Sequence, residues 1–170
     1  MGKVKGSCYK KCGFQRYGFT CVANAVSKEI NAIGLGAVVR DSTGSFIAGL
    51  SKRVDNMTCP MTVKALAALD GIKLAQQLEC QRQFIEGDAP NIISALKSRE
   101  ANLPKIGHIV NEIKKLVDSF QEVQILQVKR TGNYVAHSFA KEALFIHGII
   151  YWRDVSRDFV MPSLLKDAPA

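Results

Sequence analysis

The chain has 170 residues, of which 47% are hydrophobic, and its formal net charge is +8. This length and apolar content suffice for one well-buried core, and two domains are not expected. No run reaches the ~18 apolar residues that a membrane-spanning helix needs, so we expect a soluble chain without membrane contact. The positive charge favours polyanionic partners, although lysines and arginines spread along a chain in this way also serve solubility alone.

The cysteines bear on the compartment and on metal binding. They are odd in number and have no repeating spacing: Cys8, Cys12, Cys21, Cys59 and Cys80. We therefore expect a reducing, intracellular setting, in the nucleus or cytoplasm, with organelle targeting as a minor alternative. Cys8 and Cys12 have the spacing of half a zinc site, but the histidines are scattered, so zinc is not expected.

The composition along the chain predicts three segments. Residues 1–20 carry five basic side chains, no acid and no periodicity, and we expect a flexible basic arm. Residues 21–147 are predicted to form the folded domain, with a first strand at residues 20–27. Residues 148–170 are apolar but aperiodic, and they are predicted to lie along the body as an irregular tail anchored by Tyr151 and Trp152.

The first half of the domain predicts a hairpin followed by a helix. Residues 33–54 contain two β-rich runs separated by Ser42, Thr43 and Gly44, which is typical of an antiparallel hairpin. Gly34 and Gly36 mark either a bulge or a place where a neighbouring backbone comes close. Beyond Pro60, apolar residues recur at helical spacing up to residue 78 and predict an amphipathic helix.

The stretch FIEGDAPNIISAL, residues 84–96, predicts a strand that leads directly into a helix. It places Glu86 and Asp88 at the end of the strand, where open α/β folds bind their ligands. Asp88 also precedes Pro90 closely enough to cap the helix, and for this residue alone the cap is the commoner role.

The remaining elements complete a mixed α/β architecture. A helix is predicted at residues 106–117, a strand at 122–129 and a last helix at 134–145. Two strand–helix–strand crossovers after a meander require antiparallel strands first and parallel strands later, with helices on both faces of one sheet.

Four motifs in this order carry a resemblance: GLGAVVRDSTGSFIA, KALAALDGIKLA, FIEGDAPNIISAL and VKRTGNYVAHSFAKEAL. Together they resemble the plant group of type-1 ribonuclease H-like domains, found in retroelement-derived proteins, over roughly residues 22–152. The resemblance implies a five-stranded sheet with three antiparallel and two parallel strands. It also implies an activity, the magnesium-dependent hydrolysis of the RNA strand of an RNA–DNA hybrid.

The family holds its metal ions with acids at four positions, and this sequence departs from that pattern. The first-strand Asp corresponds to Ala23, the helix Glu to Lys64, the fourth-strand Asp to Asp88 and the last-helix acid to His137. The retained carboxylate is Asp88, and Glu86 joins it only if the strand stays regular through the glycine between them. We expect Lys64 and Asp88 to form an ion pair where the ions would bind.

Three functions remain open at this level. We expect a domain that binds an RNA–DNA hybrid or duplex through its phosphates, without sequence readout, catalysis or a cofactor. The alternatives are a hybrid ribonuclease that uses magnesium and a structural or interaction remnant of a retroelement. The predicted contacts are Lys64, Lys129, Arg130, Asn133 and Lys141. Each cation is equally explained as a solvated surface charge, and Asn133 as a helix N-cap. No oligomeric state is predicted.

Overall fold

The computed structural model describes residues 17–56, 59–98 and 103–153. The predicted basic arm up to residue 16, with Cys8 and Cys12, and the tail beyond residue 153 lie outside these ranges. The elements, in chain order, are β1 (Tyr17–Ser27), β2 (Ala32–Arg40), β3 (Phe46–Asp55), α1 (Pro60–Gln77), β4 (Arg82–Gly87), α2 (Pro90–Lys97), α3 (Gly107–Val117), β5 (Glu122–Gln127), η1 (Arg130–Gly132), α4 (Tyr134–Glu142), η2 (Ala143–Phe145) and β6 (Ile149–Arg153).

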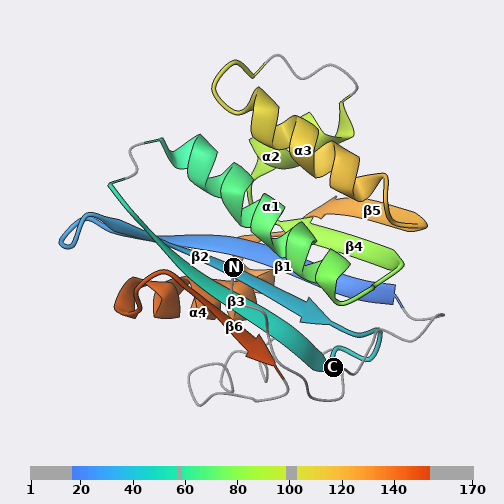
Figure 1. Ribbon diagram of the computed structural model, residues 1–170, viewed down its shortest axis with the longest axis horizontal. Helices are drawn as coiled ribbons and strands as arrows, with labels where there is room; N and C mark the ends of the chain where they lie inside the picture. Colours follow the sequence, from blue (N-terminus) through green and yellow to red (C-terminus); the bar gives the residue numbers. More distant parts are fainter. Residues whose placement is uncertain (1–16, 57–58, 99–102, 154–170) are drawn as a thin grey trace.

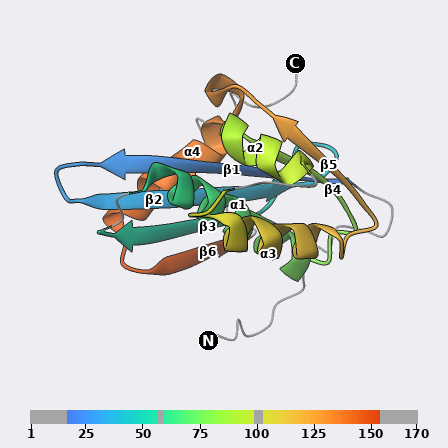
Figure 2. The same ribbon diagram turned by 90° about the horizontal axis from the view of Figure 1, so that it is seen from above.

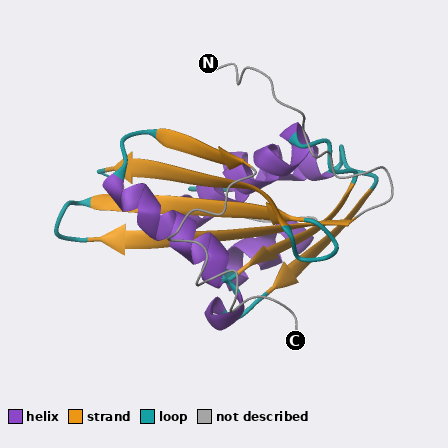
Figure 3. Cartoon of the chain, turned by 90° about the horizontal axis from the view of Figure 1, so that it is seen from below, coloured by secondary structure: helices purple, strands orange, loops and turns teal. Residues whose placement is uncertain are grey.

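The strands form one mixed, twisted sheet in the order β5-β4-β1-β2-β3-β6 (Figure 1, Figure 3). β1, β2 and β3 pair antiparallel, whereas β4 pairs parallel with β1 and β5 parallel with β4. The predicted fold class, an antiparallel meander extended by two parallel strands, is confirmed. In the described part of the chain, no helix is long and apolar enough to cross a membrane.

Both predicted ends of the domain need correction. β1 begins at Tyr17, so the residues just before position 21 belong to the sheet and not to an arm. The predicted irregular tail is wrong for Ile149–Arg153, which form β6, a sixth strand antiparallel to β3. Trp152 does act as an anchor, because its Nε1 donates a hydrogen bond to Ser51 Oγ at 3.2 Å. This strand was not predicted because residues 149–152 are all apolar and show no alternation with polar residues, whereas backbone pairing with β3 orders them.

Helices cover the two faces of the sheet (Figure 2). On one face α1, α2 and α3 enclose the larger apolar cluster, and the predicted helix beyond Pro60 is confirmed as α1. On the other face α4 packs over β1, β2 and β3 through Val135, Ala136, Phe139 and Ala140. The regular turns of α4 end at Glu142, earlier than predicted, and a 3-10 turn follows in which Phe145 is 82% exposed.

The glycines of β2 allow α4 to come close to the sheet. A Cβ atom at Gly34 would collide with the carbonyl oxygen of Ala140, and one at Gly36 with backbone atoms of Ala136 and Ala140. Of the two predicted roles for these glycines, close backbone approach is therefore confirmed, and the irregularity in β2 lies elsewhere, between Val39 and Arg40. This close packing places the first turn of α4 beside Val22 and Asn24 of β1.

Replacing Gly36 by alanine should destabilise the domain on the order of 3 kcal/mol, because a helix backbone cannot yield to the added methyl group as a flexible side chain can. Chemical denaturation followed by circular dichroism measures the change. Gly107→Ala is the matched control, since nothing lies within 4 Å of a Cβ at that position. An unchanged unfolding midpoint for Gly36→Ala would contradict the close packing of α4.

Candidate nucleic-acid interface

A cleft opens where β4 ends beside the middle of β1, between these strands, α1 and the start of α2. Its lining includes Ala23 and Asn24 from β1, Lys64 from α1 and Asp88 from the β4–α2 connection, together with apolar side chains. β1 and β4 run parallel with Val22 opposite Gly87, so the residues after Val22 and after Gly87 reach the same edge. Three of the four positions predicted from the resemblance therefore line one cleft.

Asp88 is half-buried in this cleft and does not cap α2. The N-cap position belongs to Ala89, and no side-chain hydrogen bond caps the helix. The predicted capping role is therefore wrong, since Pro90 starts the helix one residue later than an Asp88 cap requires. The carboxylate of Asp88 is left facing the site.

Lys64 is half-buried and lines the same cleft from α1. The predicted ion pair is not formed, because no carboxylate of the described residues lies within 4.0 Å of its ammonium group, that of Asp88 included. Other cations on this body do have such partners, as Lys52 has in Asp70 at 2.9 Å. The cleft thus holds a cation and an anion that are close without being paired.

Glu86 lies opposite Cys21 on the same face of the sheet and is hydrogen-bonded to it. β4 pairs regularly through Gly87, and Cys21 Sγ donates a hydrogen bond to Glu86 Oε2 at 3.2 Å. Burial, reinforced by the adjacent carboxylate, raises the pKa of the Cys21 thiol to about 12, so the thiol stays protonated as the donor. Arg40 Nη2 lies 3.8 Å from the same sulfur. Cys21 and Arg40 were not predicted, because only the strand register brings them to Glu86.

His137 connects α4 to Asn24 in the second half of β1. Arg130 Nη2 lies 3.0 Å from His137 Nε2, and a second hydrogen bond joins the ring to the backbone of Asn24. A guanidinium group only donates, so Nε2 accepts and Nδ1 carries the proton toward the carbonyl oxygen of Asn24. Burial, and then the charges of Arg130 and Lys141, lower the pKa of His137, while the charge of Asp88 opposes this shift.

The other predicted contacts divide into buried and exposed residues. Asn133 is only 1% exposed, and its Nδ2 donates to the carbonyl oxygen of Val22 at 2.8 Å. It occupies the N-cap position of α4 but makes no side-chain cap bond, so it ties α4 to β1 and is unsuited to contact a ligand. Lys129, Arg130 and Lys141 are exposed beside His137.

The side chains in this region are not suited to bind a pair of magnesium ions. Two such ions need several carboxylate oxygens, and among the described residues Asp88 is the one acid that lines the cleft. Nε2 of His137 faces a guanidinium group, and Lys64 brings positive charge to the cleft. Within the described ranges, no group of three or more His, Cys, Asp or Glu side chains is arranged to hold a metal ion.

Comparison with known families identifies the class of this domain. Residues 22–143 match the reverse transcriptase-like family, and the chain belongs to it. No protein of curated function matches the chain.

Solved structures show the same fold at low sequence identity. RNase H1 from the halophilic archaeon Halobacterium salinarum is 18% identical, with a TM-score of 0.69, over 76% of this chain and 98% of that one. The N-terminal RNase H domain of a Mycobacterium tuberculosis protein is 15% identical, with a TM-score of 0.68, over 76% and 94%. An RNase H1 in complex with an RNA/DNA hybrid is 15% identical, with a TM-score of 0.59, over 77% and 97%. The fold is that of RNase H.

The pKa of His137 should lie below the ordinary value of about 6.5, and removing the neighbouring cation should raise it. Arg130→Gln is expected to raise this pKa, because it removes a positive charge that opposes protonation, whereas Asp88→Asn should lower it. A pH titration of the ring signals by NMR measures both shifts and the Nδ1–H tautomer. A pKa that is insensitive to Arg130 would contradict the contact.

Proposed function

We propose that this domain binds nucleic acid through the phosphate backbone and has lost the metal-dependent cleavage of its fold family. The observation that carries the proposal is Lys64, whose ammonium group pairs with no carboxylate of the described residues and lies in the cleft where the resemblance implies a carboxylate. An ammonium at this place repels a magnesium ion and attracts a phosphate group. The same substitution therefore argues against catalysis and for binding.

The charges around the cleft support an anionic partner. Lys129, Arg130 and Lys141 are exposed near the start of α4, and His137 holds Arg130 by accepting a hydrogen bond from it. Phosphate contacts by such cations supply affinity without reading the base sequence. A structural neighbour bound to an RNA/DNA hybrid supports the choice of a hybrid or duplex as the partner.

The proposal also includes the subgroup of the family to which the domain belongs. The order of the four motifs supports a place in the plant, retroelement-derived group of ribonuclease H-like domains. Two alternatives are kept because they give different results below. They are a magnesium-dependent hybrid ribonuclease, and a remnant without nucleic-acid binding.

An RNA–DNA hybrid should bind with an affinity that falls steeply as salt rises. Removing one phosphate contact by Arg130→Gln or Lys141→Gln should reduce the magnitude of the log–log salt slope by ~0.9 on a duplex. Fluorescence anisotropy with a labelled hybrid at a series of salt concentrations measures the slopes. Lys115→Gln, an exposed lysine on α3, is the control of equal charge. Binding that does not respond to salt would contradict a phosphate contact, and absence of binding would support the remnant.

The unmodified protein should not cleave a labelled hybrid in magnesium. Lys64→Glu alone should gain little, because the acid of the first strand is still missing. Combined with Ala23→Asp it supplies three carboxylates with Asp88, and it should permit metal binding beside His137. Ala23 is only 4% exposed, so the unfolding midpoint of this variant must be measured in parallel. Robust cleavage by the unmodified protein, abolished by Asp88→Asn, would establish the ribonuclease instead.

A further inference from the structure

A second hollow adjoins the cleft, between the beginnings of α1 and α2. It is lined by Pro60, Met61, Lys64, Ala89, Pro90, Asn91 and Ile92, and its volume is about 170 Å³. A water molecule takes up ~30 Å³ of liquid, so the space admits several waters or one compact polar group. Lys64 lines this hollow as well as the cleft, whereas Asp88 lines the cleft alone.

The two polar side chains that line this hollow can both donate hydrogen bonds, and none of the described residues lining it is acidic. Lys64 contributes an ammonium group with no carboxylate of the described residues within 4.0 Å. Asn91 is exposed at the rim and contributes an amide. The remaining lining is apolar or backbone, so the chemistry of the hollow favours an anion with several acceptor oxygens.

The two helix starts add to the charge of Lys64. α1 and α2 both begin with a proline at the hollow, neither has an acidic residue in its first turn, and neither has a side-chain cap. The positive ends of both helices thus lack the carboxylate that often occupies them. This contribution is secondary, because the lysine supplies the full charge.

We infer that this hollow is a metal-independent phosphate site, in which Lys64 and Asn91 bind one phosphate of the nucleic-acid backbone. The inference rests on the proposed function and specifies how that binding occurs. The phosphate lies on the α2 side of Lys64, in a hollow that Asp88 does not line, so binding does not require a metal ion to neutralise this carboxylate. Affinity is then the same with and without magnesium at equal ionic strength.

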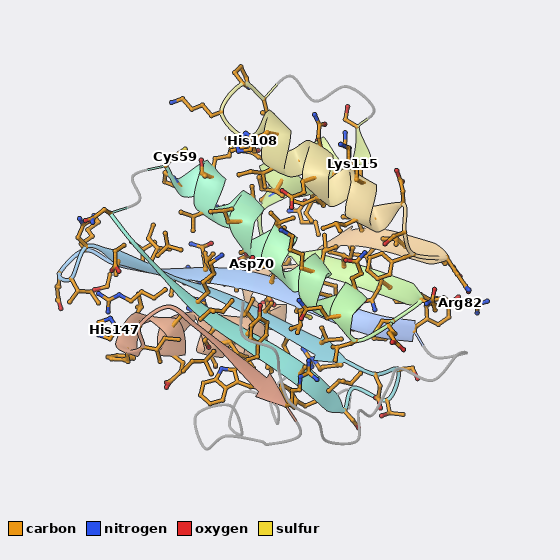
Figure 4. All side chains as sticks on the ribbon, viewed as in Figure 1. Cys59, Asp70, Arg82, His108, Lys115 and His147 are labelled. Atoms are coloured by element: carbon orange, nitrogen blue, oxygen red, sulfur yellow. The ribbon has the colours of Figure 1, made fainter. Side chains whose placement is uncertain are left out.

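The test measures binding of a labelled RNA–DNA hybrid by anisotropy, in EDTA and in magnesium, for matched variants. Lys64→Met removes the charge at similar length and should reduce the magnitude of the salt slope by ~0.9. Lys115→Met removes an equal charge from α3. Figure 4 shows Lys115 well apart from Cys59, the residue that immediately precedes α1 and therefore marks the position of the hollow. This control should bind as the unmodified protein does.

A second variant separates loss of binding from loss of folding. Asn91→Asp puts a carboxylate at the rim and should weaken binding in EDTA. The same acid in the first turn of α2 favours the helix, so the fold should not be weakened. Unfolding midpoints of all variants accompany the binding curves.

The outcomes distinguish this inference from the proposed function. If the unmodified protein binds no hybrid, the proposed function itself fails. If it binds but needs magnesium, or if Lys64→Met and Lys115→Met behave alike, the site inferred here is wrong and binding is elsewhere. Inorganic phosphate and a nucleoside monophosphate are then tested as competitors of the labelled hybrid. These competitors show whether the bound phosphate group comes from the nucleic-acid backbone or from a small molecule. Lys64-dependent binding of these small anions without hybrid binding would overturn the assignment to a nucleic-acid backbone.

Discussion

The close packing of α4 against the sheet is the constraint on which the site depends. Gly34 and Gly36 have no side chain to hold the helix away, and two hydrogen bonds then fix its position. Ser51 Oγ donates to the carbonyl oxygen of Phe139 at 2.8 Å, and Asn133 ties the start of the helix to Val22. Because Val22 immediately precedes Ala23 and Asn24, the same contacts hold His137 beside these residues of β1.

The site differs from a metal centre through the partners of its remaining acids and bases. Glu86 accepts a hydrogen bond from Cys21 and is not among the residues that line the cleft, and the accepting nitrogen of His137 is occupied by Arg130. Lys64 argues more strongly against a metal centre, because its positive charge repels every cation that enters the cleft. A low-dielectric cleft strengthens this repulsion, and it strengthens the attraction to phosphate equally.

Fold and chemistry therefore carry different information about this protein. The family match establishes the family of the chain, and the RNase H structures establish its fold. They do not establish cleavage, because at 13–18% identity the similarity concerns the arrangement of strands and helices and not the side chains of the site. The function proposed here rests on the side chains at one edge of the sheet.

The sequence alone determined the order of strands and helices from β1 to α4, since hydrophobic periodicity, glycine turns and prolines at helix starts act locally. It also determined which residue types occupy the four expected acid positions. Only the tertiary structure decided how these residues are used. It placed Asn133 in the core, joined Glu86 to Cys21, separated Lys64 from Asp88 and added β6 to the edge of β3. Each of these outcomes depends on strand register and helix docking between residues far apart in the chain, and local spacing carries no information about either.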